Sequence, residues 1–263
     1  MRALKALLGL ALVVVLALAL IAPGVWIYTA STLPNRIESA MDIETHLRQS
    51  IESERTGLSA ALSPSERRSV KWERPDFSRL PKRLVAMFIT ETGCPTYFQT
   101  PRDDGWPWLK RLLVKTATGR ELDGDGACEL IFARMLARRL GATTTMQVTV
   151  ATERIHRFLQ KDQLVAMNLM SFQFEPGLIG VEDAARVLLQ KELSQMTDAE
   201  LAELQLAIPP WGYWYDIKRC TNAPLVRQAR DGLVRRLAEE GLMSQEMAKT
   251  AAAQAPRCLA VKR

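Results

Sequence analysis

Four cysteines and two histidines are the side chains of this sequence best suited to act as nucleophiles or to bind a transition metal. The cysteines are Cys94, Cys128, Cys220 and Cys258, and none lies in a C-x-x-C spacing. Structural zinc sites use such closely spaced ligands, so none is expected here. Because the number of cysteines is even, an oxidising compartment would permit two disulfides in any of three pairings. Four buried free thiols are the alternative.

Two other short patterns could do chemistry. The first, Asp123-x-Asp125, resembles part of a calcium loop but lacks the remaining ligands, which favours a turn. The second is an aromatic loop at residues 211–215, whose rings could stack on a sugar, anchor at a bilayer interface or pack within the protein. Sugar stacking would make Trp211 and Trp214 substrate-binding residues. No G-x-S-x-G motif occurs and histidines are few, so a hydrolytic triad is not indicated.

The N-terminus is expected to anchor these groups to a membrane. Residues 6–35 carry no charge, and Arg2 and Lys5 precede them. A stretch of this length can span the hydrocarbon core, with Trp26 and Tyr28 at the far interface. The basic N-terminus predicts a single pass through the inner (cytoplasmic) membrane, with the rest of the chain outside, in the periplasm. A cleaved signal peptide is the alternative, although its apolar region is usually only about 7–15 residues.

The composition indicates a folded protein with no affinity for nucleic acid. With 48% hydrophobic residues, 263 residues are enough for a sizeable core. The formal net charge of +6 would attract anionic lipid headgroups or a lipid pyrophosphate. No stripe of Lys and Arg interleaved with aromatic residues occurs, so nucleic acid is not an expected partner.

A helix with a narrow apolar stripe is expected from residue 36 to about residue 59. It could lie against the membrane or against the domain that follows, or it could be a solvated linker helix. Two prolines between residues 63 and 75 indicate a connector after it. The apolar stripe consists of Ile37, Met41, Ile43, Leu47 and Ile51.

Most of the remaining chain has helical patterns. A helix with Pro81 in its first turn is expected to end at Gly93. Thr197-x-x-Glu200 is a capping box that opens another helix, and Gly241 suits the C-terminal cap of a third. The expected helices cover residues 80–89, 109–114, 128–140, 181–190 and 225–240, with a long loop at 96–108 and, on β propensity alone, a strand at 143–152.

Several motifs follow one another in the second half of the chain. They are Lys161-Asp162, Leu164-Val165, Asn168-Leu169-Met170, Gly180-Val181-x-x-Ala184-Ala185, Lys191, Met196-Thr197-x-x-Glu200-x-Ala202, and residues 228–237 with Gly241. Their order resembles that of the peptidoglycan glycosyltransferases of family 51, which include the lysozyme-like domain of bifunctional penicillin-binding proteins. The resemblance runs from Leu80 to about Met247 and implies helix, not strand, at residues 143–152.

The resemblance implies a mainly α-helical protein, with a lysozyme-like glycosyltransferase domain behind an N-terminal transmembrane helix. In the family, one Glu deprotonates the acceptor hydroxyl and a second assists the departing lipid pyrophosphate, often with a divalent metal. By position the first of these residues would be Glu91, whereas the second falls on His156. Glu153, three residues earlier and nearly one helical turn away, is the second catalytic candidate if the backbone is shifted, with His156 as the alternative. Lys161 would bind substrate. The expected organisation is a membrane anchor at 1–35, a juxtamembrane helix and linker at 36–79, the glycosyltransferase-like domain at 80–250 and a tail at 251–263.

The sequence departs from the family where the chemistry lies. Thr92 replaces the Asp that follows the first catalytic Glu, and only Leu136 of the Gly-rich donor-site motif is kept. The expected function is therefore that of a glycosyltransferase-like protein of cell-wall synthesis that acts on, or binds, lipid-linked disaccharide-peptide or glycan. The alternatives are an inactive scaffold or adaptor and a lysozyme-like glycan-cleaving enzyme. The expected partners are the membrane, the lipid-linked precursor or a glycan strand, and other cell-wall synthesis proteins.

Overall fold

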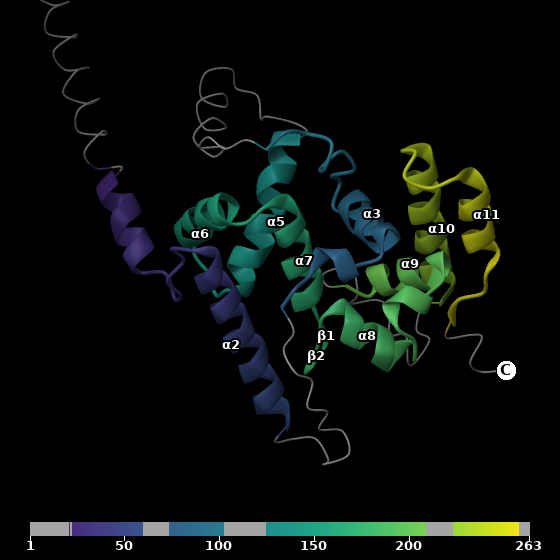
Figure 1. Ribbon diagram of the computed structural model, residues 1–263, viewed down its shortest axis with the longest axis horizontal. Helices are drawn as coiled ribbons and strands as arrows, with labels where there is room; N and C mark the ends of the chain where they lie inside the picture. The colour runs from purple at the N-terminus through teal and green to yellow at the C-terminus, as the bar shows by residue number, and fades with distance from the viewer. Residues whose placement is uncertain (1–20, 22, 60–73, 103–124, 209–222, 258–263) are drawn as a thin grey trace, which may run out of the picture.

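Helices make up most of the chain that the computed structural model describes, which comprises residues 21, 23–59, 74–102, 125–208 and 223–257 (Figure 1). This part is mainly α-helical, as expected. Strands β1 (Gln173–Glu175) and β2 (Leu178–Ile179) add a short antiparallel hairpin. The helices are α2 (Ala40–Ser59), α3 (Lys82–Glu91), α5 (Asp125–Arg139), α6 (Thr145–Phe158), α7 (Lys161–Ser171), α8 (Val181–Leu188), α9 (Asp198–Leu206), α10 (Ala223–Glu239) and α11 (Gln245–Ala253), and residues 23–31 are also helical.

The centre of the fold is α5, which packs against α6 and α7 (Figure 1). Phe132 of α5 is fully buried, and its ring centroid lies 5.2 Å from that of Phe88 in α3 and 4.7 Å from that of Tyr97. Aromatic pairs at these separations stabilise a core beyond the area that they bury. Three rings therefore join α3, and the turn after it, to α5.

Helix α10 packs against α3, α9 and α11, at the C-terminal end of the colour scale in Figure 1. The predicted capping box of α9 is present, since the Thr197 side chain and the Glu200 side chain each accept a backbone N–H of the other residue. Gly241, with φ of +72°, follows the end of α10. Both predicted helix boundaries are confirmed, because these caps satisfy backbone groups that a helix end leaves unpaired.

Gly180 sits at a close approach of two backbone segments. It precedes α8 with φ of +90°, and a Cβ added there would lie 2.9 Å from the carbonyl oxygen of Met170 in α7. Only glycine accepts both this conformation and this distance without strain. The close approach of the residue before α8 to the end of α7 therefore requires a glycine, which has no side chain.

Helix α2 packs onto the domain through its apolar stripe. Ile43, Leu47 and Ile51 are fully buried and belong to the same hydrophobic core as the later helices. Met41, expected in that stripe, is instead 75% exposed. It precedes Ile43 by two positions, about 200° around the helix, so it points away from the core. At the other end of α2, Glu54 forms an ion pair with Arg139 of α5.

Helix α6 occupies the segment where β propensity alone predicts a strand, so that prediction is wrong. Thr144 caps the helix by accepting a hydrogen bond from the backbone N–H of Gln147, whose side chain completes a capping box. Val148, Ala151 and Ile155 are buried at helical spacing. Packing of this face against α5 outweighs the preference of β-branched residues for a strand.

The remaining predicted helices are confirmed wherever the structure describes them. Helix α3 begins after Pro81, α5 covers most of residues 128–140, and α8 ends at Leu188, two residues before its predicted end. The helix expected at 109–114, most of the connector at 63–75 and residues 103–108 of the expected loop lie outside the described residues. Residues 96–102 are described and contain neither helix nor strand, as expected.

The expected membrane anchor also lies largely outside the described residues. Within them, no helix has both the length and the apolar composition needed to cross a bilayer. The segment that leads from residues 23–31 into α2 is attached to the α5–α6 region. The Asn35 side chain donates to the Leu140 carbonyl at 2.8 Å, and the Gln147 side chain donates to the Thr32 carbonyl at 3.1 Å.

Candidate functional site

One disulfide joins the end of α3 to the start of α5. Cys94 and Cys128 are bonded, with their Cα atoms 5.6 Å apart, and both are buried. The sequence left the disulfide pairing open, and the structure shows that Cys94 pairs with Cys128. Cys220 and Cys258 lie outside the described residues. A disulfide between buried structural elements is typical of proteins that fold in an oxidising compartment.

Glu91 is the last residue of α3 and faces α10. Its carboxylate forms an ion pair with the Arg236 guanidinium, and the Glu91 side chain is 15% exposed. The preceding Thr90 hydroxyl donates to the Glu240 carboxylate at 2.8 Å. In the described part of the chain, Arg236 is the hydrogen-bond partner of Glu91, so its carboxylate is oriented by the α3–α10 contact.

Glu153 and His156 lie one turn apart on α6, and both are buried, at 4% and 3% exposure. The His156 backbone carbonyl accepts a hydrogen bond from Arg102, whose guanidinium also donates to the carbonyls of Arg157 at 3.2 Å and Leu159 at 3.0 Å. A cation at this position satisfies carbonyls at the C-terminus of α6 and complements the helix dipole.

The structure places the two predicted carboxylates on different helices and in different surroundings. Glu91 is held to α10, whereas Glu153 is enclosed in the α5–α6 layer. A pair of carboxylates that controls attack and departure must reach two atoms of one bound substrate. This arrangement offers one partly accessible carboxylate, Glu91, for that task.

Lys161 holds the turn that follows α3. Its ammonium donates to the carbonyls of Tyr97 at 2.6 Å and Thr100 at 2.8 Å and to the Thr100 hydroxyl at 3.1 Å. It also lies 4.7 Å from the centre of the Tyr97 ring. An ammonium has three N–H donors, and these three oxygens match them. The observed contacts are structural, and substrate binding by Lys161 stays a prediction.

The two tryptophans predicted to bind substrate, Trp211 and Trp214, lie outside the described residues. Among the residues that are described, no group of three or more His, Cys, Asp and Glu side chains could hold a metal ion. The divalent metal implied by the resemblance therefore has no candidate ligand set in this part of the chain.

A buried cluster of charged residues holds together α9, α10 and the chain after α11. The Arg230 guanidinium is fully buried and donates to Glu203 at 2.9 Å, to Asp231 at 3.0 Å and to the Gln254 carbonyl at 2.8 Å. Burial raises the pKa of the Glu203 carboxyl, against the opposing effects of the Arg257 backbone N–H and of Arg230. Each of the three guanidinium nitrogens of Arg230 donates to a protein acceptor, so the role of Arg230 is structural.

Glu200 extends this cluster toward the loop before α9. Lys191 donates to both of its carboxylate oxygens at 2.8 Å, and the Thr197 backbone N–H donates to one of them at 2.9 Å. Burial acts to raise the pKa of Glu200, but the hydrogen bonds from Lys191 and Thr197 outweigh it and lower the pKa overall. This carboxylate is consequently kept charged and fixed at the start of α9.

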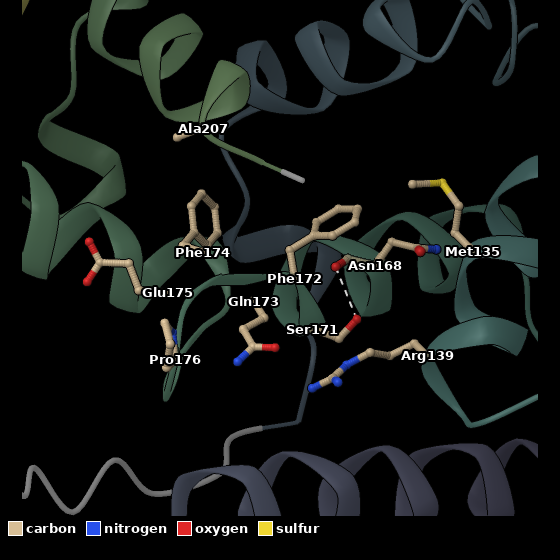
Figure 2. A pocket seen from close by; sticks show the side chains of 10 residues that line it. All are labelled: Met135, Arg139, Asn168, Ser171, Phe172, Gln173, Phe174, Glu175, Pro176 and Ala207. Carbon is tan, nitrogen blue, oxygen red and sulfur yellow. Dashed lines mark hydrogen bonds between the residues drawn. The ribbon is translucent and has the colours of Figure 1, made fainter. Parts of the chain in front are cut away.

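A cavity of about 530 Å³ opens between α5, the end of α7, β1 and the end of α9 (Figure 2). Sequence reasoning did not identify it as a site. One signal was available, because Asn168 is the only amide within the otherwise apolar run at 164–170. The lining residues are Met135, Arg139, Asn168, Ser171, Phe172, Gln173, Phe174, Glu175, Pro176 and Ala207.

Comparison of the chain with protein-family models and with curated protein sequences finds no match.

Proposed function

We propose that this protein is a membrane-anchored, noncatalytic relative of the family 51 glycosyltransferases that binds lipid-linked disaccharide-peptide, glycan or other cell-wall synthesis proteins outside the cytoplasmic membrane. The order of motifs between residues 161 and 241 supports the lysozyme-like fold. The helices α7, α8, α9 and α10 start or end at those motifs. The Cys94–Cys128 disulfide supports the location, since such bonds persist in the periplasm.

The observation that carries the noncatalytic assignment is the separate engagement of the predicted acids. Glu91 forms an ion pair with Arg236, while Glu153 and His156 are buried on α6. Polymerisation requires one group that takes the acceptor proton and another that stabilises the departing pyrophosphate. Since Glu153 and His156 are both buried, neither of these two predicted residues is accessible for the second task. The loss of the Gly-rich donor-site motif agrees with this.

The deciding experiment is a polymerisation assay with the full-length protein in detergent. Labelled lipid-linked disaccharide-peptide and a divalent metal would be supplied to the wild type, to Glu91→Gln and to Glu239→Gln, a matched control on the outer face of α10. We expect no polymer from any of the three and equal retention of the labelled precursor by all of them. An active peptidoglycan glycosyltransferase assayed in parallel verifies the substrate.

Polymer from the wild type and from Glu239→Gln that disappears in Glu91→Gln would overturn the proposal and establish a divergent polymerase. Release of sugars from preformed glycan strands, abolished by the same substitution, would instead establish a cleaving enzyme in which a lone Glu acid suffices. Failure of the wild type to retain precursor, glycan or a cell-wall synthesis protein would contradict the binding role.

A further inference from the structure

Most of the exposed large hydrophobic side chains lie at one end of the described structure. Of the eight in the described residues, six belong to residues 21–28 or to the first turns of α2 and α6, and only Phe98 and Leu225 lie elsewhere. Single exposed apolar side chains are common on protein surfaces, whereas a group of them marks an interaction surface. These six form the apolar surface: Ile21, Val25, Ile27, Tyr28, Met41 and Met146.

Two hydrogen bonds bring the first turn of α6 to the end of the helical segment at 23–31. The Gln147 side chain donates to the Thr32 carbonyl at 3.1 Å, and the Asn35 side chain donates to the Leu140 carbonyl at 2.8 Å. Figure 1 shows residues 23–31 extending away from the domain on the side of α6. The turn between α5 and α6 is therefore fixed beside the point where the chain enters the domain.

This turn is exposed but uncharged. Residues 140–152 contain no charged side chain, and residues 143–146, with the sequence Thr-Thr-Thr-Met, are all exposed. A charged side chain loses hydration when it approaches hydrocarbon, whereas threonine and methionine do not have this cost. The turn can consequently approach a lipid surface without burying a charge.

The helical segment at 23–31 indicates what covers the apolar surface. Val25, Ile27 and Tyr28 project in different directions around the helix, and all three are exposed. A helix that is apolar around most of its circumference is typical of one surrounded by lipid, and tyrosine favours the interface. A protein partner or a second copy of the chain would have to cover the helix and the turn together. The bilayer that residues 1–35 are predicted to enter covers both at once.

We infer that the domain itself rests on the lipid bilayer, through the first turn of α6 and the residues 143–145 before it, together with Met41 at the start of α2. Met146 and Met41 lie among the headgroups and the first acyl carbons, and the threonine hydroxyls face the headgroups. The inference rests on the membrane anchoring in the proposed function. It adds a contact that fixes how the domain is oriented above the membrane.

The direct test places a photoreactive residue, p-benzoylphenylalanine, at one position of the full-length protein in nanodiscs of phosphatidylethanolamine and phosphatidylglycerol. Intact-mass spectrometry then measures the covalent addition of one phospholipid after illumination. Lipid adducts are expected with the probe at Tyr28, at Met41 and at Met146, and about 10-fold fewer with the probe at Leu225, because the reagent reacts only with groups that it touches. Leu225 is the matched control, since it is an exposed apolar residue of α10.

The outcomes separate the lipid contact from the rest of the proposed function. Adducts at Tyr28 without any at Met146 would retain the anchor and overturn the inference. Cross-links from Met146 to a second copy of the chain would overturn it in favour of a dimer, and a lack of adducts at both positions would overturn the anchoring as well. Failure to retain precursor, glycan or a cell-wall synthesis protein would contradict the binding role and leave the lipid contact standing.

A substitution tests whether the observed contacts hold the turn at the bilayer. Asn35→Ala removes the hydrogen bond to the Leu140 carbonyl and should lower the yield of lipid adduct at Met146 by about 3-fold. Gln49→Ala, on the exposed face of α2, should leave the yield unchanged. Equal yields from the two variants would show that the Asn35 contact does not position the turn and would overturn that part of the inference.

Discussion

Helix α10 forms two arginine–glutamate pairs with its neighbours, and they lie in opposite environments. Arg230 pairs with Glu203 of α9, and both side chains are almost completely buried, at 0% and 1% exposure. Arg236 pairs with Glu91 of α3, and the two are 50% and 15% exposed. The two arginines are six positions apart, so they project from different faces of α10.

This difference in burial indicates that the Arg230–Glu203 pair is needed for stability, whereas the Arg236–Glu91 pair is not. Arg230 has further acceptors in Asp231 and in the chain after α11, as a buried guanidinium requires. Arg236 has water available in place of Glu91, and exposed ion pairs contribute little stability. A substitution at Glu91 therefore reports on function with little effect on folding, which makes the polymerisation assay interpretable.

The largest effect is expected when the buried pair is broken from one side. Arg230→Met leaves the Glu203 carboxylate buried without a cation and should lower the free energy of unfolding by about 3–5 kcal/mol. Urea titration followed by circular dichroism measures the loss. Adding Glu203→Met to the same chain should recover most of it, because no unpaired charge then remains. A loss under about 1 kcal/mol would show that water enters the cluster.

The chain that follows Glu91 is held by the Cys94–Cys128 disulfide, whereas α9 and α10 are held together by the buried Arg230–Glu203 pair. Replacing Cys94 and Cys128 together by alanine should lower the free energy of unfolding by about 2–4 kcal/mol, since the bond restricts the unfolded chain across 34 positions. Reductant added to the wild type should give a loss of similar size in the same urea titration. Equal stability of the wild type and the double variant would contradict this.

Acid should weaken the buried cluster through Glu200. Because its pKa is lowered in the folded protein from the ordinary 4.5, Glu200 stabilises the fold at neutral pH, and this contribution is lost as pH falls below 4.5 through the folded pKa. Glu200→Gln should be about 1.5 kcal/mol less stable at pH 7, and the difference should shrink toward pH 3. A difference that is independent of pH between 7 and 3 would rule out the Lys191–Glu200 charge interaction as its source.

The smallest effect is expected at the exposed pair. Arg236→Ala and Glu91→Gln should each change the free energy of unfolding by less than about 1 kcal/mol, and less still in high salt. Thermal unfolding at two salt concentrations measures both variants beside Arg235→Ala on the same helix. A loss comparable to that of Arg230→Met would remove the distinction between the two pairs.

Local signals predicted the helix boundaries well because they act over a few residues. The capping box at Thr197, the glycine after α10 and the proline before α3 were all readable in the chain. The segment that became α6 shows the limit of this reasoning. Its β-branched residues favour a strand locally, and only burial of Val148, Ala151 and Ile155 on one face decides for helix.

The candidate sites were less predictable because they combine distant residues. A resemblance in motif order placed Glu91, Glu153 and His156 at catalytic positions, yet it could not show that Glu91 meets Arg236 while the other two are buried. The cavity joins side chains of α5, α7, β1 and the end of α9. No spacing along the chain predicts that these side chains lie together. The one signal in the sequence was Asn168, a polar residue within an apolar run.

By itself the sequence determined that this chain is mainly helical, where most of its helices begin and end, and that its cysteines could pair. These properties depend on backbone caps, apolar periodicity and composition, which are local. The tertiary structure alone decided that Cys94 bonds with Cys128, that Arg230 is buried while Arg236 is exposed, and that Asn168 faces a cavity. Each of these is set by which helix faces pack together, because burial and partner choice depend on neighbours that are far away in the chain.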